Sequence, residues 1–304
     1  MSQLVSGETG VFAIIVTYHA TPAHVLRLTS SLAGQVDTII MVDNGSANLA
    51  ALRMCVEHDP RIALIALAQN MGIAFAQNAG IDHARKTGAR YLIYFDQDSV
   101  ITDEFVQPLK AAFISLSATR KVAVVAPIFK DEKNGFFYPL IWLNRHGTRR
   151  KIIPTGHEAV PIPVSIAISS GTFTSMAVMD QVGGMRSEFF IDYVDIEWCL
   201  RAVNAGYALF AIPAVCMLHS IGDSSMPFLK WRLVIHSEWR RYYRIRNGFW
   251  MLRLPHVPML LALREVLINI AHQGVLLLLQ KNRRLQLKHF LRGVRDGLRG
   301  IGPA

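Results

Sequence analysis

The chain has 304 residues, of which 51% are hydrophobic and 18% are charged. This composition excludes an intrinsically disordered chain, a collagen, a coiled coil and a disulfide-rich scaffold. The net charge of +10 is unevenly spread, because residues 1–229 hold 17 basic and 19 acidic side chains while residues 230–304 hold 15 and 3. We therefore expect a near-neutral domain at 1–229 and a basic, helical C-terminal extension at 230–304.

Targeting and cysteine signals are weak. The three cysteines are far apart and include no C-x-x-C pair, so free thiols are expected rather than a disulfide framework or a zinc cluster. No basic segment followed by an apolar run opens the chain, which argues against a signal peptide. The most apolar stretch, 266–280, is shorter than the roughly 18–20 residues that a spanning helix needs. We expect no transmembrane segment.

The first 130 residues alternate between short apolar runs and helix-like segments. Strands are predicted at 11–17, 38–43, 61–67, 90–96 and 122–127, and helices at 22–33, 48–57, 73–87 and 103–117. Residues 130–163 are rich in Gly, Pro, Asn and basic residues and should leave the sheet. A strand at 163–169, a helix at 195–205 and a strand at 208–212 follow. This order predicts an α/β fold, with a Rossmann-like, mostly parallel sheet flanked by helices.

Polar residues follow four of the predicted strands. They are Thr17-Tyr18-His19, Asp43-Asn44-Gly45-Ser46, Asn70-Met71-Gly72 and Asp96-Gln97-Asp98-Ser99. Each group alone is explained by turn chemistry. Because ligands bind outside the carboxyl ends of strands in open α/β sheets, the four together favour a polar ligand site. The absence of a Walker A pattern and of G-x-G-x-x-G argues against P-loop and dinucleotide binding.

Two acidic clusters could carry the chemistry. Asp96 and Asp98 form a D-x-D at a strand end and could share a hard divalent cation, with His219 as a third ligand. Asp192, Asp195 and Glu197 crowd like charges beside apolar residues, which raises carboxyl pKa values and is typical of a general base. The alternative for Asp192 and Asp195 is an N-cap of the following helix.

A family resemblance rests on an ordered set of motifs. VTYH, VDNGS, N-x-G-x-x-x-A-x-N-x-G, FDQDS, SGT, FFIDYVDIEWCLRA and LHSIGD occur in this order. The set resembles family 2 glycosyltransferases of the GT-A fold over roughly residues 11–250. YFDQDS, FIDYVDIEW and RRYYRIRN look most like the bacterial rhamnosyltransferases of that family.

The resemblance implies inverting transfer of L-rhamnose from dTDP-L-rhamnose to a glycan or lipid-linked acceptor, with Mg²⁺ or Mn²⁺. Asp98 with Asp96, and His219, would bind the metal. Asp195 matches the catalytic base, but Val194 replaces the commoner Glu, so Asp192 stays an alternative. Gly171 and Thr172 would line the acceptor side. The residues expected to bind the nucleotide sugar are Thr17, Tyr18, Asp43, Asn44, Asn70, Asp96, Gln97 and Asp98.

Two other functions are weighed against this one. A family 2 enzyme could use another nucleotide sugar, such as UDP-glucose or UDP-galactose. A non-enzymatic nucleic-acid-binding protein could use the basic end, but no RNA-binding aromatic motif is present, so no nucleic-acid partner is expected.

The basic extension divides into three pieces. Residues 237–253 interleave arginines with aromatic residues, so Arg244 and Arg246 could bind an acceptor, or the segment could be a solvated helix face. A second helix carries one apolar face, which favours core packing: Leu260, Leu263, Leu267, Ile270, Ala271, Gly274, Leu277 and Leu278. The last helix, within 281–304, is basic and amphipathic and is typical of binding to an anionic membrane surface. We expect a cytoplasmic protein, peripheral on the inner face of the cytoplasmic membrane.

Overall fold

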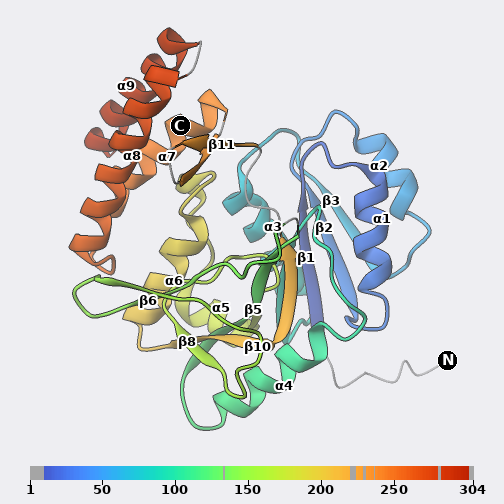
Figure 1. Cartoon of the computed structure of the whole chain (residues 1–304). Coiled ribbons are helices and arrows are strands. Elements are labelled where there is room, and N and C mark those ends of the chain that lie inside the picture. Colours follow the sequence, from blue (N-terminus) through green and yellow to red (C-terminus); the bar gives the residue numbers. More distant parts are fainter. Residues whose placement is uncertain are drawn as a thin grey trace, which may run out of the picture.

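The computed structural model describes residues 10–132, 134–219, 224–228, 231–235, 237–279 and 282–300. At residues 219, 224–228, 231–235 and 238 it describes the backbone alone. A central sheet of eight strands has the order β3-β2-β1-β4-β9-β5-β10-β8 (Figure 1).

The first half of the sheet is parallel and follows the predicted alternation. Its strands are β1 (Val11–Thr17), β2 (Thr38–Asp43), β3 (Ile62–Ala66) and β4 (Tyr91–Asp96). The connecting helices are α1 (Pro22–Ser31), α2 (Leu49–Val56) and α3 (Ile73–Lys86), followed by α4 (Val106–Ser117). Because the four strands run the same way, Thr17, Asp43 and Asp96 end at one edge of the sheet.

The second half departs from a simple parallel order. β5 (Val122–Asp131) and β10 (Ala208–His219) are parallel to each other and run several residues beyond their predicted ends. Between β4 and β5 lies β9 (Phe173–Ser175), an antiparallel strand that was not predicted. The strand predicted at 163–169 is only β8 (Ile162–Val164), antiparallel to β10. The strand ends at a bend at Ser165, whose amide donates to the Ile141 carbonyl at 2.8 Å rather than to β10.

Smaller elements complete this domain. Residues 132–161, a slightly shorter segment than the predicted 130–163, leave the main sheet and include the two-stranded sheet of β6 (Leu140–Leu143) and β7 (Arg149–Ile152). After β9 come α5 (Met176–Val182), a 3₁₀ turn (Ser187–Phe189) and α6 (Val194–Asn204). β11 (Ser224–Phe228) and β12 (Trp231–Ile235) form a separate antiparallel pair.

The basic end folds into three helices, α7 (Glu238–Met251), α8 (Met259–Leu279) and α9 (Arg283–Arg299). They stand together at the end of the molecule opposite to α1 and α2 (Figure 1). The face of α9 that is packed on α7 consists of small and polar residues, with Gln286, Gly293 and Gly297 buried. A Cβ atom at Gly293 would lie 2.8 Å from the Tyr242 carbonyl oxygen, so this close approach requires glycine.

Within the described residues, α8 is the one helix long and apolar enough to cross a membrane by length and composition. It has 21 residues, the best 18-residue window has a mean hydropathy of 1.4, and 33% of that window is buried. The helix begins at Met259 rather than after Glu265, which is why it exceeds the uncharged stretch on which the sequence-based expectation rested.

Candidate active site

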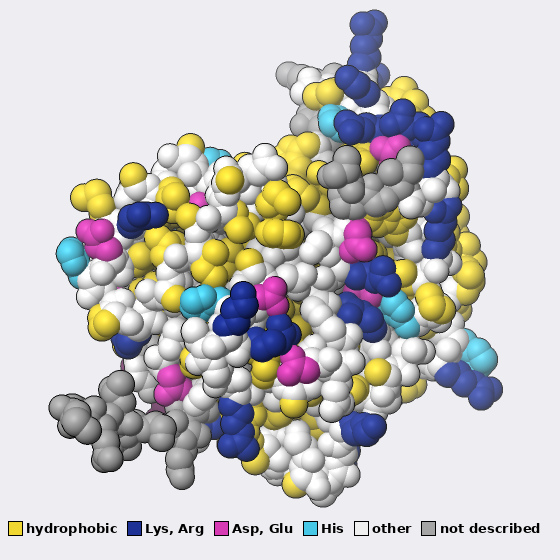
Figure 2. All heavy atoms as spheres, turned by 180° about the vertical axis from the view of Figure 1, so that it is seen from behind, with side chains coloured by type: hydrophobic (Ala, Val, Ile, Leu, Met, Phe, Trp, Pro, Cys, Tyr) yellow, Lys and Arg dark blue, Asp and Glu magenta, His cyan; other side chains and the backbone are white. Residues whose placement is uncertain are grey.

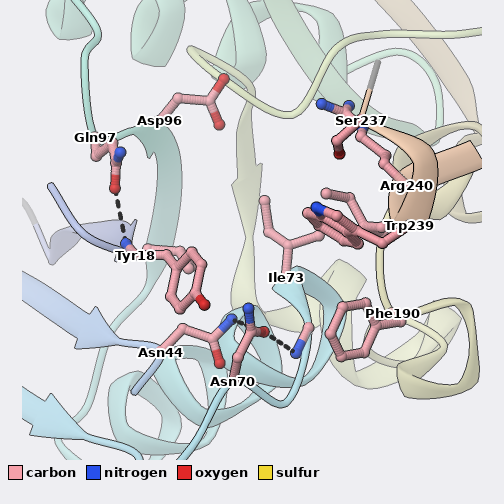
Figure 3. Close-up of a pocket in the computed structure, with 13 residues that line it drawn as sticks. Tyr18, Asn44, Asn70, Ile73, Asp96, Gln97, Phe190, Ser237, Trp239 and Arg240 are labelled. Atoms are coloured by element: carbon pink, nitrogen blue, oxygen red, sulfur yellow. Dashed lines mark hydrogen bonds between the residues drawn. The ribbon is translucent and has the colours of Figure 1, made fainter. Parts of the chain in front are cut away.

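A cavity of about 360 Å³ opens at the carboxyl edge of β1, β2 and β4. Its walls come from distant parts of the chain, as Figure 3 shows: Tyr18, Asn44 and Asn70 on one side, Asp96 and Gln97 on another, and Trp239 and Arg240 facing them. The cavity therefore lies where the polar strand ends predicted a ligand site, and α7 closes it.

Hydrogen bonds between neighbouring loops fix this wall. Asn44 donates from Nδ2 to Asn70 Oδ1 at 3.0 Å, and its own Oδ1 accepts from the Met71 amide at 2.8 Å. The Tyr18 amide donates to Gln97 Oε1 at 2.8 Å. These predicted site residues are thus brought together, and five of the eight predicted for the donor line the cavity: Tyr18, Asn44, Asn70, Asp96 and Gln97.

Thr17 and Asp43 lie beneath the cavity rather than in its wall. Both are fully buried, and Thr17 Oγ1 donates to Asp43 Oδ1 at 3.1 Å. The other Asp43 oxygen accepts from the Ser46 amide at 2.8 Å. Alternation along β1 turns Val16 toward the cavity and Thr17 away from it, so in this structure the pair supports the loop, and its contact with the donor stays a prediction.

Phe190 forms the far wall by close packing. Its ring stacks on Tyr243 of α7 with centroids 4.4 Å apart, and its carbonyl accepts from the Ile73 amide at 2.7 Å. Gly72 has a φ of +86°, and a Cβ atom there would lie 2.6 Å from the Phe190 ring. Only glycine permits this contact, which joins the start of α3 to the loop before α6.

The D-x-D carboxylates suit a hard divalent cation. Asp96 lies in the cavity wall, and Asp98 follows on an exposed turn. Burial, and then the charge of Asp98, raise the pKa of Asp96 to about 6, which shows a carboxylate short of positive partners. Two carboxylates with room beside them for phosphate oxygens fit Mg²⁺ or Mn²⁺.

The third predicted metal ligand, His219, ends β10, and its side chain lies outside the described residues. Among the side chains that are described, no three His, Cys, Asp or Glu groups gather as a metal site.

A second cavity, of about 420 Å³, adjoins the first and shares four lining residues with it: Ile73, Asp96, Ile191 and Arg240. Asp192, Asp195, Arg244 and Glu265 also line it. A ligand atom near Asp96 can therefore meet groups from both cavities, which is the arrangement that a transfer between two substrates requires.

The structure separates the roles of the two candidate bases. Asp192 is held by Arg240 at 3.1 Å and by Arg244 at 3.4 Å, one helical turn apart on α7. Asp195 accepts only a local hydrogen bond, from the Ile196 amide at 2.9 Å, among the contacts described. Burial raises its pKa to about 6. Asp195 is therefore the carboxylate free to take a proton near neutral pH.

Neither aspartate caps α6. The N-cap is Tyr193, which makes no side-chain cap. The third member of the predicted acidic cluster, Glu197, points away from the cavity: it is fully buried and pairs with Arg201 at 2.9 Å and Arg186 at 3.4 Å. Helical geometry explains this correction, since residues two apart lie on opposite sides of a helix.

The loop that carries Asp192 has a strained backbone. Phe190, Asp192 and Tyr193 have φ angles of +62°, +63° and +64°. For residues other than glycine each such conformation costs about 1–3 kcal/mol, so neighbouring structure must hold it. Asn247 of α7 does so, because its fully buried Nδ2 donates to the carbonyls of Phe189 and Ile191 at 2.8 Å and of Asp192 at 3.0 Å.

Arg246 belongs to this same support. It is 3% exposed, stacks 4.0 Å from the Trp250 ring centroid and donates to the Glu188 carbonyl at 2.5 Å. The guanidinium faces the loop's backbone rather than either cavity, and its role in binding an acceptor stays a prediction. Arg244 does reach the second cavity, as predicted.

Gly171 and Thr172 lie behind the acceptor side. Gly171 is packed against Pro127 and Phe105, and Thr172 donates to the Ile168 carbonyl at 2.5 Å. Ser169 and Ser170, just before them, line the second cavity instead. The residues of this segment that line the second cavity are therefore the two serines, although Ser170 is only 1% exposed.

Sequence reasoning missed several lining residues. Gln77 donates to Ser169 Oγ at 2.9 Å, while its buried Oε1 has no hydrogen-bond partner among the residues that the structure describes. Gln77 and Glu265 line the second cavity, and Phe190 and Trp239 the first. The motif containing Gln77 was recognised, but only the helical spacing between Ile73 and Gln77 could have shown that both face the site.

The mainly parallel sheet with flanking helices, and the two joined cavities at its carboxyl edge, fit a glycosyltransferase of the GT-A fold. The model of Glycosyl transferase family 2 matches residues 12–179. The chain is also 38% identical over 294 residues to "dTDP-rhamnosyl transferase RfbF" of Shigella flexneri, covering 97% of both chains. The protein belongs to glycosyltransferase family 2.

Solved structures show the same fold at low identity. The crystal structure of GalNAc-T7 with UDP, GalNAc and Mn²⁺ has a TM-score of 0.58 at 11% identity, over 97% of this chain and 57% of that one. S. aureus TarS 1–349 in complex with UDP-GlcNAc has a TM-score of 0.57 at 12% identity, over 96% of this chain and 81% of that one.

Proposed function

We propose that the protein is an inverting, metal-dependent rhamnosyltransferase. It moves L-rhamnose from dTDP-L-rhamnose to a hydroxyl of a cell-surface glycan or glycolipid acceptor, such as a lipopolysaccharide core or O-antigen. The observation that carries the proposal is the position of Asp195, with its pKa raised to about 6, in a cavity that shares Asp96 with the one at the strand ends. The printed name of the Shigella flexneri relative supports the sugar.

The first cavity suits the donor. Tyr18 and Trp239 offer rings, and Asn44 and Asn70 offer amides, to a base and ribose. Asp96 and Asp98 would hold Mg²⁺ or Mn²⁺, which would neutralise the charge of the departing diphosphate. Arg240 lines both cavities and adds a fixed positive charge beside Asp96.

The second cavity suits the acceptor. Asp195 takes the proton of the acceptor hydroxyl while that oxygen attacks the anomeric carbon, and the carbon–phosphate oxygen bond breaks on the opposite side. One displacement inverts the carbon. Gln77 Oε1, which is buried and has no partner in the described part of the chain, can accept a hydrogen bond from a sugar hydroxyl.

The donor panel tests this function. Purified protein with Mg²⁺ or Mn²⁺ should turn over dTDP-L-rhamnose, and UDP-glucose and UDP-galactose should react at least about tenfold more slowly in kcat/KM. Chelation should abolish turnover, and Asp98→Ala should nearly do so; Asp103→Ala, at an exposed position after the site, is the matched control.

If the protein prefers UDP-glucose or UDP-galactose, the donor sugar is glucose or galactose and not rhamnose. Salt-dependent RNA binding without any donor turnover would instead favour the nucleic-acid alternative. We also propose that the enzyme works peripherally on the inner face of the cytoplasmic membrane, which the basic end at 230–304 supports.

A further inference from the structure

Helix α8 exposes the leucine stripe that the sequence assigned to core packing. Leu267 and Leu278 are 64% and 73% exposed, so that prediction is wrong. The inner face buries other apolar residues, such as Leu261, together with the polar Asn269 and Gln273, which are 3% and 1% exposed. A helix of a soluble domain places its main apolar stripe toward the core, so two buried polar residues opposite an exposed leucine stripe need a cause.

Hydrogen bonds fix the orientation. Asn269 Nδ2 donates to the Tyr193 hydroxyl at 2.7 Å, and its Oδ1 accepts from Arg244 at 3.2 Å. The fully buried Arg241 donates to Gln273 Oε1 at 3.2 Å and to the Asn269 carbonyl at 3.2 Å. Rotating the leucines inward would leave a buried guanidinium without these partners, which is strongly unfavourable.

The outer face forms a long apolar surface. It runs from Leu260 to Leu278, about 27 Å at 1.5 Å per residue. One charged residue, Arg264, lies within it by helical spacing; its side chain is 38% exposed and pairs with Glu265 at 2.7 Å. The residues more than 40% exposed are Met259, Leu260, Leu263, Leu267, Ile268, Ile270, Leu278 and Leu279. Continuous exposed apolar surface of this size marks a contact with a membrane or a partner.

Helix α9 adds charge beside this surface. It contacts α8, and with Gln286, Gly293 and Gly297 turned toward α7 its leucines stay outside: Leu287, Leu291 and Leu298 are 42%, 56% and 57% exposed. Arg284, Lys288, Arg295 and Arg299 border this stripe by helical spacing. Figure 2 shows Lys and Arg side chains gathered over the C-terminal helices, with hydrophobic side chains along the adjoining edge.

We propose that α8 and α9 together form a membrane-binding surface that lies in the plane of an anionic bilayer. The leucines enter the boundary of the acyl chains, and the basic side chains of α9 meet lipid phosphates. This proposal rests on the proposed membrane location, but not on the identity of the donor or acceptor. It differs from the sequence-based expectation in giving the main apolar contact to α8.

Two other occupants fit less well. A spanning helix would lie wholly within the bilayer. The inner side of α8 instead contacts Tyr193 and Arg241, which belong to the walls and support of the cavities. A second copy of the chain would bring two rows of basic side chains on α9 near each other, and like charges repel. An anionic bilayer matches both the apolar and the basic part.

The surface lies close to the acceptor cavity. Glu265, on the inner side of α8, lines that cavity and accepts from the Tyr193 hydroxyl at 3.3 Å. The bilayer and the cavity would therefore be separated by about one helix diameter, roughly 10 Å. A lipid-linked acceptor could reach Asp195 without leaving the membrane surface.

Vesicle flotation tests the surface directly. The full chain is mixed with vesicles of 30% phosphatidylglycerol and 70% phosphatidylethanolamine, about the charge density of an anionic leaflet. A variant with Leu263→Ser, Leu267→Ser and Ile270→Ser should bind about tenfold or more weakly. A control with Met54→Ser and Ile114→Ser, which are 70% and 47% exposed elsewhere, should bind like the wild type. High salt and vesicles of phosphatidylcholine alone should weaken binding of all forms.

The proposal would be overturned if the triple variant floated with vesicles as well as the wild type does. It would also be overturned if the wild type bound no vesicles but formed a dimer, seen by sedimentation, that dissociates in the variant. Donor turnover in detergent is measured in parallel. It should be unchanged in the triple variant, so loss of vesicle binding and failure of the proposed activity are read separately.

Discussion

Replacing Asp195 by Asn should reduce transfer by about a thousandfold, because the acceptor hydroxyl then loses the group that takes its proton.

The same variant should be more stable than the wild type. Burial raises the pKa of Asp195 to about 6, so the folded chain binds this proton more tightly than the unfolded chain does. Ionisation of the group therefore lowers stability as the pH rises from about 4 to about 6. At pH 7 an amide removes that penalty, of about 3 kcal/mol.

Progress curves of donor turnover check the expected loss of transfer, and thermal unfolding at pH 7 checks the expected gain in stability. The matched control is Asp103→Asn, at an exposed position, which should change neither quantity. Wild-type kcat/KM should fall as the pH drops below about 6, since the proton acceptor must be ionised. The profile is best measured at saturating divalent cation, because the pKa of Asp96 is also raised to about 6. Normal activity in Asp195→Asn would rule out this aspartate as the base.

The second large effect is expected at Asn247, which never touches the cavity. Asn247→Ala removes three hydrogen bonds from the loop carbonyls of Phe189, Ile191 and Asp192. The Phe189 carbonyl keeps donors in the Ile191 amide and in Arg246, but the carbonyls of Ile191 and Asp192 lose theirs. A buried carbonyl without a donor costs about 1–3 kcal/mol, and the costs are not simply additive. We expect a loss of about 3 kcal/mol in the free energy of unfolding and a fall of about a hundredfold in kcat, because the loop can relax from its positive φ angles.

Urea unfolding and steady-state kinetics measure this pair of effects. Asn204→Ala, at the exposed end of α6, is the control and should behave like the wild type. A purely structural role would lower stability but leave kcat unchanged in the fraction that stays folded. That result would show that the backbone strain in the loop is unrelated to the placement of Asp192 and Asp195.

The sequence predicted the first half of the sheet well because its strands are buried on both faces. Continuous apolar runs ended at the correct residues in β1, β2 and β4, and the polar groups after them did gather. β9 escaped prediction because Phe173–Ser175 is too short for a hydrophobic pattern. It is a strand only because β4 and β5 lie on either side to pair with it.

The basic end was harder to interpret, since its residues act through tertiary contacts. Arg244 and Arg246 look alike in sequence, yet they are 200° apart around α7, so one reaches the cavity and the other the loop backbone. Periodicity alone could have separated them. It could not have shown which face of α8 is outside, because that depends on Arg241 and Tyr193, which hold the polar face inward.

The stereochemistry of the product tests the central claim most directly. Wild-type protein is given dTDP-L-rhamnose and a hydroxyl acceptor, and the anomeric configuration of the glycoside is determined by NMR spectroscopy. A single displacement with Asp195 as the base predicts that the configuration is opposite to that of the donor. A rhamnoside with the donor's configuration retained would contradict this account of the site.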